Sequence, residues 1–73
     1  MIYFIIDLES GNYEGTFAFE AEALAKVRDA VTRFERSVAE PWGLGRKDAE
    51  GRVENLGEGE ALIVRALAAQ ARI

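Results

Sequence analysis

The longest regular pattern in the chain is an apolar stripe of helical period in residues 21–40. Large apolar side chains recur there at steps of three and four residues, which places on one side of a helix Leu24, Val27, Val31, Phe34 and Val38. Polar residues such as Lys26 and Asp29 fall on the opposite side. Pro41 ends the run, because the residue before a proline is pushed out of helical geometry. The pattern predicts one long helix over residues 21–40 that packs on a sheet.

Two segments of alternating pattern precede this helix and predict a β-hairpin. In residues 1–9 one face carries Ile2, Phe4, Ile6 and Leu8, and the other carries Tyr3, Ile5, Asp7 and Glu9. In residues 13–19 one face carries Gly15, Phe17 and Phe19, and the other carries Glu14, Thr16 and Ala18. A two-residue turn at Gly11 and Asn12 would pair Ile6 with Phe17 and Phe4 with Phe19. We therefore expect Phe4 and Phe17 to face the helix and the carboxylates to face solvent.

The second half of the chain is less regular. Residues 41–45 are rich in proline and glycine and predict a loop. Residues 52–56 and 60–67 predict two more strands around a glycine-rich turn, although the alanines of residues 66–71 favour a helix and leave the tail open. The expected fold is α+β with two layers, an antiparallel ββαββ sheet packed on one long helix, in a single domain of residues 1–73.

The composition restricts the chemistry that the chain can perform. The 73 residues include no histidine and no cysteine, which removes the usual general base, thiolate zinc sites and the cysteine nucleophile. Exposed carboxylates without an enclosing pocket are poor catalytic groups. We expect no catalytic residues, no metal site, no cofactor and no enzymatic activity.

The hydrophobic segments are too short for a signal peptide or a membrane-spanning helix. Residues 1–6 are apolar but lack a basic start and meet Asp7 at once. No run approaches the roughly 20 apolar residues that cross a bilayer. The expected location is the cytoplasm, with no membrane contact.

Charge is distributed unevenly along the chain. Residues 1–25 hold five acids and no base, a net charge of -5, whereas residues 26–73 hold eight acids and nine bases, a net charge of +1. This layout disfavours direct nucleic-acid binding and favours a basic protein surface as partner. The candidate partner-binding residues are Tyr3, Asp7, Glu9, Glu14, Glu20, Glu22 and Trp42. The alternative is that the charged residues only protect the hairpin from pairing with other chains.

Trp42 admits two interpretations. A large aromatic residue can close the open end of a thin core, or it can anchor a partner at an interface. A chain of 73 residues has few other large side chains to close that edge. The core interpretation is therefore preferred.

Three short segments resemble one family of known proteins. Glu14-Gly15-Thr16, Glu20-Ala21 and Leu24-Ala25-Lys26, which runs into a helix, are similar to the hairpin-then-helix opening of some small phage-encoded anti-CRISPR proteins. The resemblance covers about the first half of the chain and includes no signature motif. It implies a stoichiometric inhibitor in the host-cell cytoplasm whose carboxylates cover DNA-binding sites of a CRISPR effector complex.

A second resemblance suggests another class. Gly11-Asn12-Tyr13-Glu14-Gly15 after an opening strand is similar to the start of HicB-type antitoxins. That family usually continues with a segment of proline and glycine that ends in cysteine, whereas this chain goes directly into its helix. The resemblance implies an antitoxin-like or homodimeric regulatory subunit.

Overall fold

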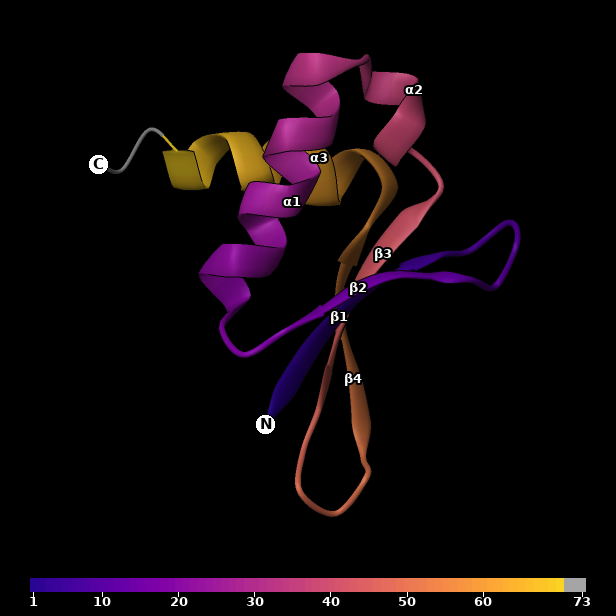
Figure 1. The fold of residues 1–73 in the computed structure, drawn as a ribbon, viewed down its shortest axis with the longest axis vertical. Helices are drawn as coiled ribbons and strands as arrows, with labels where there is room; N and C mark the ends of the chain where they lie inside the picture. The colour runs from indigo at the N-terminus through magenta and orange to yellow at the C-terminus, as the bar shows by residue number, and fades with distance from the viewer. Residues whose placement is uncertain (71–73) are drawn as a thin grey trace.

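A computed structural model describes residues 1–70 as an α+β fold of two layers, in which helices cover one face of a four-stranded antiparallel sheet (Figure 1). The elements are β1 (Ile2–Asp7), β2 (Tyr13–Phe17), α1 (Glu20–Arg33), α2 (Arg36–Ala39), β3 (Trp42–Lys47), β4 (Val53–Glu58) and α3 (Gly59–Gln70). The strand order is β2-β1-β3-β4, so β1 and β3 are central. Each helix described within residues 1–70 is too short or too polar to span a lipid bilayer.

The core lies between the sheet and the pair α1 and α3. Ile5 of β1 and Leu44 of β3 are register partners, and both are fully buried on the face that the helices cover. Tyr3 and Phe17 are half-buried on the same face. The two helices contribute three alanines and four larger apolar residues, namely Ala23, Leu24, Val27 and Ala30 from α1 and Leu62, Ile63 and Ala66 from α3. Small side chains let two helices lie close to each other and to a thin sheet.

The predicted orientation of β1 is wrong. Ile5 faces the helices, whereas Phe4 and Ile6 lie on the opposite, uncovered face. The cause is on β3, where Leu44 is the one bulky apolar side chain next to Ile5, while Gly43 and Gly45 leave a furrow on the other face. On the covered face β3 adds the buried side chains of Leu44 and Trp42 to that of Ile5, whereas its glycines offer no side chain to a helix on the other face.

The predicted hairpin register is also wrong. Tyr3 pairs with Phe17 and Phe4 with Thr16, and a β-bulge at Glu14 shifts the next pair to Ile6 and Tyr13. The connection spans residues 8–12 rather than two residues, and the Asp7 amide donates to the Asn12 carbonyl at 2.8 Å. Phe19 therefore pairs with no strand residue but precedes α1, where it is exposed.

The predicted long helix is interrupted after Arg33. Phe34 leaves helical geometry, with φ -115° and ψ -100°, and the short α2 follows. A helix over residues 21–40 would be about 30 Å long, whereas a six-residue strand spans only about 20 Å. The break returns the chain to the sheet, so that Ala39 and Trp42 are buried while Phe34 and Val38 of the predicted stripe are exposed.

Residues 41–45 are not a loop. From Trp42 onward they form β3, paired with β1 on one side and with β4 on the other. The glycines alternate with Leu44, so they occupy one face of the strand. An added Cβ at Gly45 would overlap the ring of Phe4, which therefore rests directly on the glycine backbone.

The chain ends differently from the predicted second hairpin. The strand predicted over residues 52–56 is confirmed as β4, but the strand predicted over residues 60–67 is helix α3. Gly59, with φ +60°, turns the chain out of the sheet, and Leu62, Ile63 and Ala66 are then buried together at helical spacing. The open tail is helical to Gln70, and residues 71–73 lie outside the described residues.

The assignment of the two faces predicts that alanine substitutions of two isoleucines on β1 lower the stability of the protein by different amounts. Ile5→Ala is expected to lower the free energy of unfolding by about 2 to 5 kcal/mol, because Ile5 is fully buried. Ile2→Ala is expected to cost less than about 1 kcal/mol, because Ile2 is 51% exposed. Urea denaturation followed by circular dichroism measures both, at one protein concentration low enough that the chain is a monomer. Equal losses would contradict the assignment.

Candidate functional site

Trp42 is a core residue. It begins β3, is 5% exposed and belongs to the same buried cluster as Ala39 and Leu44. The preferred interpretation of this residue is confirmed. Trp42 is therefore not available as an exposed anchor for a partner, in contrast to its place among the candidate partner-binding residues.

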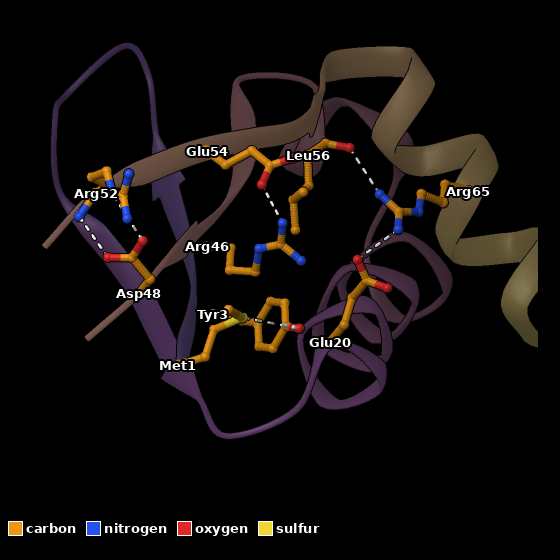
Figure 2. Close-up of polar contacts among 9 residues, drawn as sticks. All are labelled: Met1, Tyr3, Glu20, Arg46, Asp48, Arg52, Glu54, Leu56 and Arg65. Atoms are coloured by element: carbon orange, nitrogen blue, oxygen red, sulfur yellow. Dashed lines mark hydrogen bonds and ion pairs between the residues drawn. The ribbon is translucent and has the colours of Figure 1, made fainter. Parts of the chain in front are cut away.

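Tyr3 belongs to a polar row that crosses the sheet. It pairs with Arg46, and Arg46 pairs with Glu54 on β4. Figure 2 shows the Arg46 guanidinium pointing to the carboxylate of Glu54, to which it donates, and the Tyr3 hydroxyl pointing to the sulfur of Met1 at 3.8 Å. The hydrogen bond to Glu54 and a further one to Tyr3 raise the pKa of Arg46. Tyr3 therefore lies with a cation rather than with the carboxylates.

Glu20 and Glu22 bind groups of this chain at the start of α1. The Arg65 guanidinium donates to Glu20 Oε2 at 2.6 Å and to the Leu56 carbonyl at 2.8 Å, which joins α1, α3 and β4 (Figure 2). Glu22 Oε1 accepts from the Phe19 amide at 3.3 Å, as the carboxylate of a capping box does. Acidic side chains at the positive end of a helix stabilise it, so both residues have a role in folding.

Asp7 organises the connection between β1 and β2. Its Oδ1 accepts from the amides of Glu9 at 2.9 Å and of Ser10 at 3.2 Å, and its carbonyl accepts from the Gly11 amide at 2.7 Å. Such a turn places an aspartate carboxylate over successive backbone amides. Asp7 is half-buried and combines a structural role with its charge.

The remaining candidates gather at one end of the sheet with an acid that the sequence analysis missed. Glu9 lies in the connection after β1, and Glu14 lies beside Tyr13, the partner of Ile6. Glu40 precedes Pro41, whose carbonyl accepts from the Leu8 amide at 2.8 Å. We call Asp7, Glu9, Glu14 and Glu40 the acidic end. Within residues 1–70 none of the four takes part in an ion pair.

A second surface is the sheet face that no helix covers. Its register rows place side by side a set of apolar residues that we call the open apolar face, namely Ile2, Phe4, Ile6, Leu8, Tyr13 and Val53. Gly43 and Gly45 form the floor of a groove of about 170 Å³ in it. The rings of Phe4 and Tyr13 meet edge to face with centroids 5.4 Å apart. Lys47 and Glu58 lie on this face toward opposite ends of the strands.

The sequence offered no local signal for Glu40 or Glu58. Each is a single acid far along the chain from the first hairpin, and only the strand order places Glu40 beside the β1–β2 connection and Glu58 in the row of Gly43 and Ile6. The predicted topology treated residues 41–45 as a loop and so could not place residues 40 and 58 beside the first hairpin.

The two surfaces suit contacts with a macromolecule. A group of carboxylates attracts cationic side chains, and a flat apolar face buries area against a protein. No three acidic, histidine or cysteine side chains within residues 1–70 come together in a way that would hold a metal ion. Comparison with protein-family models, curated proteins and solved structures finds no significant match to this chain.

Two substitutions of Asp7 distinguish the contribution of its hydrogen bonds to stability from the contribution of its charge. Asp7→Ala is expected to lower the free energy of unfolding by about 1 kcal/mol, because two backbone amides lose their acceptor. Asp7→Asn removes the same charge but keeps an acceptor oxygen, and we expect a loss below about 0.5 kcal/mol. Chemical denaturation of the two variants measures the difference. Equal losses would show that the amides do not depend on this side chain.

Proposed function

We propose that the chain is a protein-binding module that inhibits or regulates a basic, nucleic-acid-binding protein by placing its acidic end in the partner's basic groove. The observation that supports this most is that Asp7, Glu9, Glu14 and Glu40 lie at one end of the sheet and that none of them takes part in an ion pair within residues 1–70. Basic grooves that bind phosphates attract carboxylates by the same electrostatic force.

Folding gives little reason for this arrangement. Like charges held close together repel one another and lower stability. Protection of a sheet edge accounts for Glu14, because β2 is an edge strand. Glu9 and Glu40 lie outside the strands and protect no edge, and Asp7 alone has a clear role in a turn. The exposed charges of Glu9 and Glu40 are therefore better explained by a cationic partner.

The class of partner follows from the charge and from the resemblance of the hairpin and helix to anti-CRISPR proteins. A CRISPR effector complex has the basic DNA-binding surface that the acidic end requires, and it is the partner that we propose first. The inhibitor would act by occupancy, with one chain covering one site. No catalytic step is part of this proposal.

The test compares two double variants with the same formal charge. Glu9→Lys with Glu14→Lys reverses half of the acidic end, and Asp29→Lys with Glu50→Lys makes the same change on α1 and in the β3–β4 connection. Each replacement adds two charges, so both variants have a formal net charge of zero instead of -4. The control removes only exposed ion pairs, with Arg33 and Arg52, which contribute about 0.2 to 1 kcal/mol each.

Each protein is immobilised and exposed to a nuclease-treated lysate of the native host at about 0.15 M salt, and retained proteins are identified by mass spectrometry. We expect the wild type and the control to retain a common nucleic-acid-binding protein, which the acidic-end variant retains about tenfold less. Excess DNA should displace that protein. Where it is a CRISPR effector complex, the same variants are assayed for inhibition of its DNA binding. Equal retention by the two variants, or retention unaffected by DNA, would contradict the proposal.

A further inference from the structure

The open apolar face holds four of the nine large hydrophobic residues that are exposed within residues 1–70. Four of its six residues are more than half exposed, namely Ile2 (51%), Leu8 (53%), Tyr13 (64%) and Val53 (63%), and Phe4 and Ile6 between them are half-buried. An antiparallel sheet with one face in solvent normally carries polar side chains on that face. Here both faces of β1 are apolar, so the uncovered face is suited to bury area against another sheet.

We propose that a second copy of this chain covers the open apolar face, so that two sheets pack face to face around a two-fold axis. This surface borders the acidic end, since Leu8 and Tyr13 are chain neighbours of Glu9 and Glu14, but the proposal rests on the apolar side chains and does not depend on the proposed function. An interface between two copies must be self-complementary, because each patch meets the same patch of its partner. The charges and glycines of this face meet that requirement.

The two charged residues of the face lie toward opposite ends of its strands. Lys47 pairs with Ile2 at one end, and Glu58 pairs with Gly43 at the other. A two-fold axis that lies in the interface and runs across the strands exchanges the two ends. Lys47 of each copy then approaches Glu58 of the other, one strand away. Neither residue takes part in an ion pair within residues 1–70, so both are available for this contact.

The glycines of β3 provide the space for this arrangement. The same axis places Lys47 of one copy over Gly43 of the other, where no side chain stands in the way of its aliphatic stem. Phe4 lies in the middle row, with the end of its ring over Gly45, so the two copies of Phe4 meet close to the axis. A single charge of either sign on this face would not select a second copy, but an opposite pair at the two ends does.

The association is measured by sedimentation equilibrium from about 10 µM to 1 mM, where a dimer has twice the 8.1 kDa mass of the chain. Phe4→Lys is expected to weaken the dimer about 100-fold, because both copies lose a central aromatic residue. Circular dichroism checks that the variant is folded.

Charge reversal keeps the test decisive if Phe4→Lys fails to fold. Lys47→Glu alone and Glu58→Lys alone should each weaken the dimer about tenfold, since the axis repeats each contact twice. The double variant restores the pair with its sign inverted and should return to within about threefold of the wild type. Lys26→Glu on the outer side of α1 is the matched control and should leave the dimer unchanged.

Four outcomes would overturn the proposal. The first is a wild type that remains monomeric at 1 mM, and the second is a dimer that Phe4→Lys leaves intact in its folded form. The third is a double charge reversal whose effect is the sum of the two single reversals. The fourth is a monomeric wild type that binds a host protein through Phe4, which would place a foreign partner on this face.

Discussion

The burial of Ile5 and Leu44 beneath two helices is the contact on which the rest of the structure depends. These two side chains are neighbours across β1 and β3, and they are the large, fully buried residues that the central strands contribute to the core. The helices approach them with alanines as well as with Val27 and Leu62, which keeps the two layers close. A domain of this size buries only about 60% of its unfolded surface, so it has one thin core and cannot cover both faces of its sheet.

Both candidate surfaces follow from that constraint. Because the helices occupy one face, the apolar side chains on the other face of β1 remain open, and Gly43 and Gly45 leave a groove on the neighbouring strand. Because β3 inserts beside β1, the end of α2 meets the β1–β2 connection and brings Glu40 to Asp7. One fold thus presents an apolar surface and an acidic surface that do not compete with the core. A chain that forms a dimer through the first would carry the second at both ends.

The elements with a strong hydrophobic period could be predicted from the sequence. The buried face of β1 could not, because both of its faces are apolar. The first hairpin, the start of α1 and the strand at residues 53–58 follow from pattern, but β1 carries three apolar residues on its open face, with Leu8 directly after it, and only Tyr3 and Ile5 on its buried face. The alternation of apolar and polar residues in β1 therefore predicted the wrong face as the buried one. Proline and glycine near Trp42 resembled a loop, although glycine on one face of a central strand only makes room for Phe4. Of the candidate site residues, Glu9 and Glu14 remain exposed, while the structure uses Glu20, Glu22 and Trp42 internally.

The most direct test of this account is a set of nuclear Overhauser contacts between methyl groups in a sample labelled at isoleucine, leucine and valine. The account predicts contacts from the Ile5 methyl groups to core methyl groups of α1 or α3, such as those of Val27 and Leu62, and none from Ile6 to either helix. Contacts from Ile6 to the helices, with Ile5 lacking them, would reverse the two faces of the sheet. The open apolar face would then be the core.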